Sequence, residues 1–145
     1  MSNEPATLIA RLETAPRGDK ELTADVYEAL GYLTIRAPKW SGGISWRCRR
    51  PGDQRWCAMR DLTERIDDAA SIVPEGYCWS VHRGYGGKCW AIVTTDMQAG
   101  MPRGEWWSPG GDPTDNRPAL RSAAHALCIA AAKAHLLPSA FASVV

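Results

Sequence analysis

The chain has 145 residues, 45% of them hydrophobic, and its 17 Lys and Arg residues against 16 Asp and Glu residues give a formal net charge of +1. This composition indicates one globular domain over residues 1–145 and excludes a disordered chain, which would be less apolar and more strongly charged. It also excludes an integral membrane protein, because no apolar run approaches the roughly 18 residues that span a bilayer.

The first 31 residues are expected to form two helices. After Pro5, apolar residues recur at helical spacing until Pro16, which ends the run. Asp19 is a suitable N-cap for a second helix, and Gly31 is placed as its C-terminal stop. The chain therefore opens with a helical segment that buries one face of each helix.

Residues 32–60 change to an alternation of apolar and polar side chains, which predicts strands. Turn residues at 41–43 and 51–53 divide the segment into three strands. Arginines occupy many of the polar positions. The pattern predicts a meander with one apolar face and one strongly basic face.

A central helix is expected over residues 61–73, with Asp61 or Thr63 as its cap. It is followed over residues 77–95 by two β-rich runs that a Gly-rich turn joins into a hairpin. A helix that leads into a hairpin suits a domain in which helices cover an antiparallel sheet.

Residues 96–117 are rich in Gly and Pro and are expected to form a loop, which is long enough to favour a functional role. An Ala-rich helix is expected over residues 118–137, beginning at Pro118. The fold class is therefore α+β, with N-terminal, central and C-terminal helices covering an antiparallel sheet.

The five cysteines are an odd number without a Cys-x-x-Cys motif, which indicates reduced thiols rather than a secreted disulfide framework. The first residues lack the features of a secretory signal, so a cytoplasmic location is expected. Cys78, His82 and Cys89 offer three zinc-ligand types, but the paired spacing and fourth ligand of a structural site are missing. No metal and no cofactor is predicted.

Three segments carry a resemblance to a known family. They are residues 8–13 (LIARLE), the central 66–70 (IDDAA) with 72–76 (IVPEG) and Trp79, and the Ala-rich 119–134. In these segments the chain resembles the phage ABA sandwich domain, a family of small bacteriophage proteins. The resemblance implies an α-β-α sandwich and a bacteriophage setting, and it implies no reaction.

The near-zero net charge hides a basic strand region. Between Arg36 and Arg60 there are seven cations and one acid, and all seven tryptophans lie between Trp40 and Trp107. Arg forks fit phosphate or carboxylate and Trp rings stack on bases, so the combination suits a nucleotide-like ligand. The candidate ligand-binding residues are Trp40, Arg47, Arg49, Arg55, Trp56, Arg83, Lys88, Trp106 and Trp107. The same residue types suit a protein interface, and each Trp alone also suits the core.

Catalytic chemistry is not indicated. The Gly-rich segment 83–88 joins two strands rather than a strand and a helix, so it predicts a hairpin turn and not a P-loop, although its two cations suit an anion. Asp67 and Asp68 are adjacent on a helix and point about 100° apart, which makes them poor partners for acid–base work. Neither His125 nor His135 lies in a catalytic motif. We therefore predict no enzyme.

The leading functional hypothesis is a bacteriophage accessory protein of the host cytoplasm that sequesters an anionic nucleotide signal of host defence. The alternatives are a protein that binds and inhibits a host defence complex, as anti-CRISPR proteins do, and a nucleotide hydrolase. DNA binding is disfavoured because a pI of 7.7 lacks an overall basic footprint. A homodimer in which two Arg/Trp faces enclose one ligand is a further hypothesis.

Overall fold

The computed structural model describes residues 4–16, 18–95, 104–111 and 119–137. Two helices open the chain, as predicted: α1 (Pro5–Thr14) and α2 (Lys20–Ala29). Pro5 occupies the first turn of α1, and the Asp19 side chain accepts a hydrogen bond from the Leu22 amide at 2.7 Å, which caps α2. Leu8, Leu12 and Val26 are fully buried, so both helices turn their apolar faces inward.

The next three strands form sheet A, whose order is β1 (Leu33–Pro38), β2 (Ile44–Arg49) and β3 (Cys57–Ala58). The prediction that one face is apolar and the other basic is wrong. The antiparallel register places Leu33 opposite Arg49 and Ile35 opposite Arg47, so the apolar positions of β1 share a face with the arginines of β2. Each strand alternates as expected, but the register decides which side chains share a face.

The central helix is shorter than the predicted 61–73. Helix α3 covers Ile66–Ala70, and its N-cap Arg65 makes no side-chain capping bond. The Asp61 carbonyl accepts from the amides of Glu64 and Arg65, which makes residues 61–65 a turn. The Asp61 amide donates at 3.0 Å to the carboxylate of Asp68, which gives Asp68 a structural role at the start of α3.

Sheet B contains β4 (Cys78–Arg83), β5 (Cys89–Thr94) and β6 (Glu105–Trp107), in that order. The first two strands form the predicted hairpin. The third corrects the prediction of a loop over 96–117, because Ile92 pairs with Trp107 and Val93 with Trp106. Residues 96–103 and 112–117 of that predicted loop lie outside the described residues.

The C-terminal helix α4 covers Ala123–Leu136, so it begins later than the predicted residue 118. The Ser122 hydroxyl accepts from the His125 amide at 3.2 Å and caps the helix there. Just before it, Leu120 exchanges backbone hydrogen bonds with Cys89 and so extends sheet B. Residues 124–132 are all buried, which identifies α4 as the central helix of the core.

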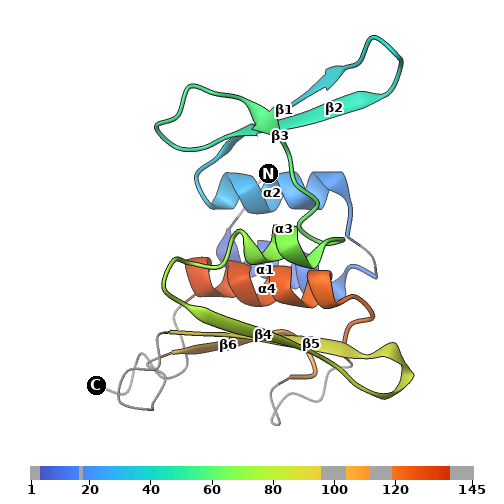
Figure 1. Ribbon diagram of the computed structural model, residues 1–145, viewed down its shortest axis with the longest axis vertical. Helices are drawn as coiled ribbons and strands as arrows, with labels where there is room; N and C mark the ends of the chain where they lie inside the picture. The colour runs from blue at the N-terminus through green and yellow to red at the C-terminus, as the bar shows by residue number, and fades with distance from the viewer. Residues whose placement is uncertain (1–3, 17, 96–103, 112–118, 138–145) are drawn as a thin grey trace.

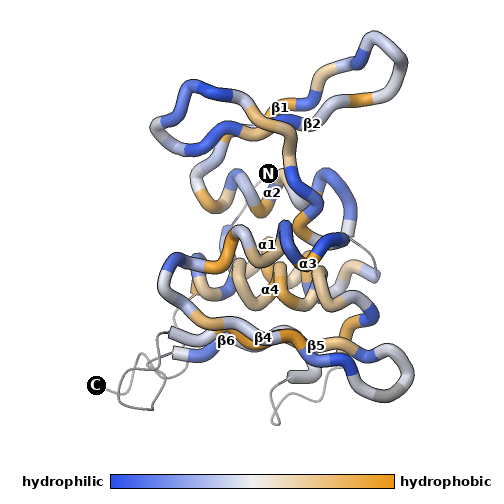
Figure 2. Tube along the Cα trace, viewed as in Figure 1, coloured by the Kyte–Doolittle hydropathy of each residue, from blue (hydrophilic) through white to orange (hydrophobic). Residues whose placement is uncertain are grey.

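The α+β class is confirmed, while the layer order differs from the α-β-α expectation. Figure 1 shows the helices lying between sheet A and sheet B, with α4 against sheet B and α2 against sheet A. Helix α4 is apolar along most of its length (Figure 2) and its residues 124–132 are buried, so it must be covered on every side. Sheet B covers one side and α1 and α3 cover the other. In the part of the chain that the structure describes, no helix is long and apolar enough to cross a membrane.

Candidate ligand-binding site

The outer face of sheet A, turned away from α2, brings together several of the predicted ligand-binding residues. Thr34 and Arg36 point toward α2, because their side chains contact Glu28 at 2.5 Å and Glu21 at 3.5 Å. Strand alternation therefore turns Leu33 and Ile35 outward, and the register adds Arg49 and Arg47 to the same face. No described element covers this face in Figure 1.

Trp56 completes this surface by stacking with an arginine. It directly precedes β3, and the register that pairs Cys48 with Cys57 places Trp56 opposite Arg49. The guanidinium carbon of Arg49 lies 5.1 Å from the centroid of the Trp56 ring, within cation–π range. We call Arg47, Arg49 and Trp56 the Arg/Trp face.

The cations of this region differ in whether they have acidic partners. Arg36 pairs with Glu21 at 3.5 Å and Arg60 with Asp68 at 3.6 Å. Arg47 and Arg49 have no carboxylate within salt-bridge distance among the residues that the structure describes, nor have Arg50 and Arg55. Their N–H groups are therefore available to an external anion.

A hollow of about 660 Å³ beside α2 and a second of about 620 Å³ at the end of β2 are both large enough for a small ligand. The first contains Arg11 and Arg36, whose charges are already paired. The second adjoins the Arg/Trp face and contains two arginines without acidic partners. Its lining residues are Gly31, Leu33, Arg49, Arg50, Pro51, Gly52, Asp53 and Gln54. The second hollow is the better anion site.

The structure does not bring all of the predicted site residues into one cavity. Arg47 and Arg49 lie on β2 of sheet A, and Arg55 and Trp56 lie in the segment that directly precedes β3. Trp40 lies fully exposed in the turn between β1 and β2. Of the other four predicted residues, Arg83, Trp106 and Trp107 lie on sheet B and Lys88 directly precedes its strand β5; sheet B lies beyond the helices (Figure 1).

On sheet B, the two neighbouring tryptophans have structural partners. Trp106 is only 9% exposed, stacks on Tyr77 at 5.7 Å between ring centroids, and donates its indole N–H to the Leu137 carbonyl at 2.9 Å. Trp107 is half-buried and donates to the Glu105 carboxylate at 3.1 Å. Trp106 is therefore a core residue rather than a ligand contact.

The Gly-rich segment is the hairpin turn that its sequence predicts. The Gly84 amide donates to the Lys88 carbonyl at 2.8 Å, which closes the turn. Arg83 and Lys88 are exposed at its two ends. On the same hairpin Cys78 pairs with Thr94 and Cys89 with Arg83, so the two cysteines lie at opposite ends of the ladder. No group of three metal-ligating side chains occurs among the described residues.

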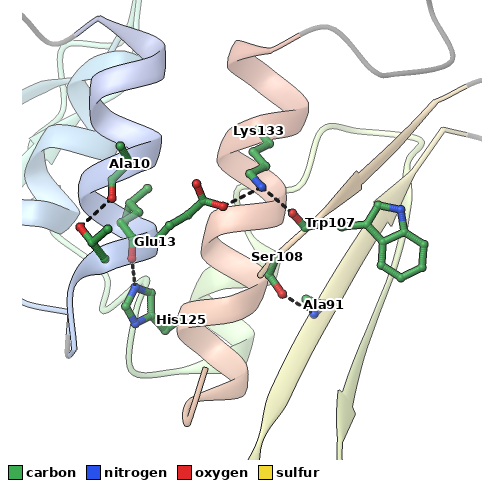
Figure 3. Close-up of polar contacts among 9 residues, drawn as sticks. Ala10, Glu13, Ala91, Trp107, Ser108, His125 and Lys133 are labelled. Atoms are coloured by element: carbon green, nitrogen blue, oxygen red, sulfur yellow. Dashed lines mark hydrogen bonds and ion pairs between the residues drawn. The ribbon is translucent and has the colours of Figure 1, made fainter. Parts of the chain in front are cut away.

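A buried polar network between α1, α4 and β6 escaped the sequence analysis (Figure 3). The Lys133 ammonium contacts the Glu13 carboxylate at 2.9 Å and donates to the Trp107 carbonyl at 2.7 Å. The imidazole Nε2 of His125 donates to the Leu12 carbonyl at 2.8 Å. These contacts join the helices to sheet B, and they place no nucleophile beside a base. The helical spacing that put Glu13 and Lys133 at the edges of apolar faces was the only signal in the sequence.

The environment of His125 predicts a pH dependence of stability. Burial lowers the pKa of His125 below its ordinary value of 6.5. The imidazole is thus neutral in both folded and unfolded chains above about pH 6.5, and below that pH the unfolded chain binds the proton more readily. We expect the stability that His125 contributes to be complete above pH 6.5 and to fall as the pH decreases. Urea unfolding between pH 7.5 and 5.5 measures it.

A His125→Gln variant is the control, because Gln can donate to the Leu12 carbonyl but does not titrate. The variant should lose less stability than the wild type over the same pH range. Equal pH slopes would contradict the role given to His125.

Comparison with known proteins gave no match to a family model, to a curated protein or to a solved structure.

Proposed function

We propose that this protein acts by binding an anionic ligand on the Arg/Trp face and in the adjoining hollow at the end of β2. The observation that carries the proposal is the stack of Arg49 on Trp56 at 5.1 Å, with no described carboxylate paired to the arginine. Stacking uses the flat face of the guanidinium and leaves its N–H edge to donate to phosphate or carboxylate oxygens.

A nucleotide suits this chemistry because it combines phosphates with a flat base. Arg49 and Arg50 border the hollow of about 620 Å³, and ligand pockets commonly measure about 300–1,000 Å³. Trp56 is partly exposed, and an exposed indole offers a stacking surface for a base. In the bacteriophage setting that the family resemblance implies, the ligand is a nucleotide signal of host defence and the protein sequesters it in the host cytoplasm without catalysis.

A second candidate function is inhibition of a host defence complex through protein binding. It is favoured by the exposure of Leu33 and Ile35, which are 51% and 43% exposed on the same face as Arg47 and Arg49. Exposed aliphatic residues beside Arg and Trp are typical of protein interfaces.

Ligand titration tests the first candidate. Cyclic dinucleotides, cyclic oligonucleotides and ADP-ribose are titrated by calorimetry and by thermal shift, and at least one should bind saturably. Because a hydrogen bond to a charged group contributes about 1.5–3 kcal/mol, Arg49→Ala should weaken binding by roughly 10–100-fold. Arg83→Ala on sheet B is the matched control and should bind as the wild type does.

Three outcomes separate the candidates. Intact nucleotide recovered after heat denaturation supports sequestration, whereas altered nucleotide supports a hydrolase. Ile35→Ser should preserve nucleotide binding and weaken docking of a protein partner, because it removes apolar surface from the face without placing a charge opposite Arg47. No binding by any nucleotide in the panel, or equal losses in Arg49→Ala and Arg83→Ala, refutes the nucleotide site.

A further inference from the structure

Two cysteines lie directly opposite each other in sheet A. The register of β2 and β3 pairs Cys48 with Cys57. The Met59 amide donates to the Trp46 carbonyl at 3.1 Å, so Trp46 and Met59 form a hydrogen-bonded pair, and by alternation so do Cys48 and Cys57. Residues of such a pair have Cα atoms about 5.5 Å apart, within the range of about 4.4–6.8 Å that a disulfide requires.

The two thiols differ in exposure. Side chains of opposed residues point to the same face, and Cys48 is buried on the α2 side of the sheet at 7% exposure, whereas Cys57 is exposed. Burial, and secondly the charge of a Cys57 thiolate, raises the pKa of Cys48. The exposed Cys57 is therefore the thiol that meets an oxidant first, with Cys48 beside it to complete the bond.

We propose that Cys48 and Cys57 form a reversible disulfide that fastens β3 to β2, and that a small-molecule disulfide such as oxidised glutathione is the oxidant. The Cys57 thiolate attacks one sulfur of glutathione disulfide, which releases one glutathione thiolate and leaves a mixed disulfide. Cys48 loses its proton and attacks the Cys57 sulfur, which releases the second glutathione. Two protein thiols are oxidised while one glutathione disulfide is reduced to two thiols. Disulfides in cytosolic proteins are usually of this transient, redox-sensing kind.

The cysteine pair is adjacent to two residues of the Arg/Trp face. Arg49 directly follows Cys48, and Trp56 directly precedes Cys57. Strand β3 itself consists of only two residues. A disulfide across this short strand restricts the position of Trp56 relative to Arg49. The expected effect on ligand affinity rests on the proposed function, whereas the disulfide itself does not.

The remaining cysteines provide controls within the same chain. Cys89 and Cys128 are buried, and the Cys89 thiol donates to the Gly87 carbonyl at 3.6 Å. Cys78 is exposed on sheet B, on the other side of the helices from the proposed pair (Figure 1). Cys78→Ser is therefore a suitable parent protein, because it removes the other exposed thiol without touching sheet A.

The test is oxidation of the Cys78→Ser protein with oxidised glutathione, followed by intact mass and peptide mapping. We expect the mass to fall by about 2 Da through loss of two hydrogens, two thiols to become unreactive, and one peptide to link residues 48 and 57. The thermal midpoint should rise by on the order of 5 °C, and dithiothreitol should reverse each change. Adding Cys57→Ser should abolish all four effects.

Two results would overturn the proposal: a stable glutathione adduct on Cys57 with Cys48 still reduced, or dimers linked through Cys57. Cys48→Ala is the second variant, and in it Cys57 should retain the glutathione adduct that the wild type resolves. Because mass and thiol counts need no ligand, they settle the disulfide even if no nucleotide binds. Comparing nucleotide affinity before and after oxidation then tests its effect on the Arg/Trp face separately.

Discussion

A Lys133→Met variant is expected to lose about 3–5 kcal/mol of folding stability, the usual cost of removing one partner from a buried ion pair. The Lys133 and Glu13 side chains are 15% and 10% exposed, and their charged atoms are 2.9 Å apart. Methionine preserves much of the side-chain volume but takes the Lys133 ammonium away from the buried Glu13 carboxylate. The substitution also removes the donor to the Trp107 carbonyl. Urea unfolding at pH 7 measures the loss.

Arg11→Met is the matched control because it breaks an ion pair of similar length at the surface. Arg11 and Asp25 are 2.8 Å apart, but their side chains are 46% and 24% exposed. Solvent screens such pairs, so this variant should lose less than about 1 kcal/mol. A Lys133→Met protein as stable as Arg11→Met would mean that the Glu13–Lys133 pair is not buried as described.

A double variant separates the cost of keeping the Glu13 carboxylate without Lys133 from the value of the pair. Glu13→Gln removes the carboxylate charge, so Lys133→Met combined with Glu13→Gln leaves neither charge buried. The double variant should be more stable than Lys133→Met alone. A cycle over the four proteins gives the coupling energy between the two side chains.

Local patterns predicted the elements whose stability is set locally. Asp19 predicted the start of α2 because an N-cap acts on the amides that follow it, and the Gly-rich turn predicted the hairpin of β4 and β5. The sequence pattern did not predict β6, because its three residues form a strand only by pairing with β5. Helix α4 begins where Ser122 caps it, whereas sequence spacing favoured Pro118.

The number of sheets and the facing of their side chains depend on contacts between distant residues. Helix α4 has little polar surface, so it requires sheet B on one side and helices on the other, and the strands divide accordingly into two sheets. In sheet A the alternation was correct on each strand, but pairing Ile35 with Arg47 turned an expected apolar face into a mixed one. A shift of one residue in register would have reversed that outcome.

The candidate site was only partly predictable, because contacts between distant residues decide which side chains share a surface. Arg47, Arg49 and Trp56 were selected by composition and lie together, because they are close along one meander. Trp106 was selected by the same criterion but belongs to the core of the other sheet. Composition identifies residues capable of binding, and only the fold determines which of them share a surface.

Gly18→Ala is the second substitution for which we expect a large effect, a loss of about 3 kcal/mol through overpacking. A Cβ atom at Gly18 would lie 2.0 Å from the Thr63 hydroxyl oxygen and 2.2 Å from its Cβ. Thr63 is only 4% exposed, and it lies in the turn before α3, so its side chain has little space to move away. The methyl group must therefore displace this turn. The loss is measured by urea unfolding at pH 7.

Gly76→Ala is the matched control, because it tests backbone conformation without crowding. Gly76 has a φ of 84°, and a Cβ there would meet nothing within 4 Å, so we expect only the roughly 1 kcal/mol cost of a left-handed residue. Thr63→Gly removes the atoms that the new methyl group strikes. The double variant Gly18→Ala, Thr63→Gly should therefore lose less stability than the sum of the losses in the two single variants. If the stability losses of Gly18→Ala and Thr63→Gly simply add, or if Gly18→Ala is as stable as Gly76→Ala, the turn before α3 is not packed against Gly18. The first helical segment would then be held by its buried faces and by the Glu13–Lys133 pair without this contact.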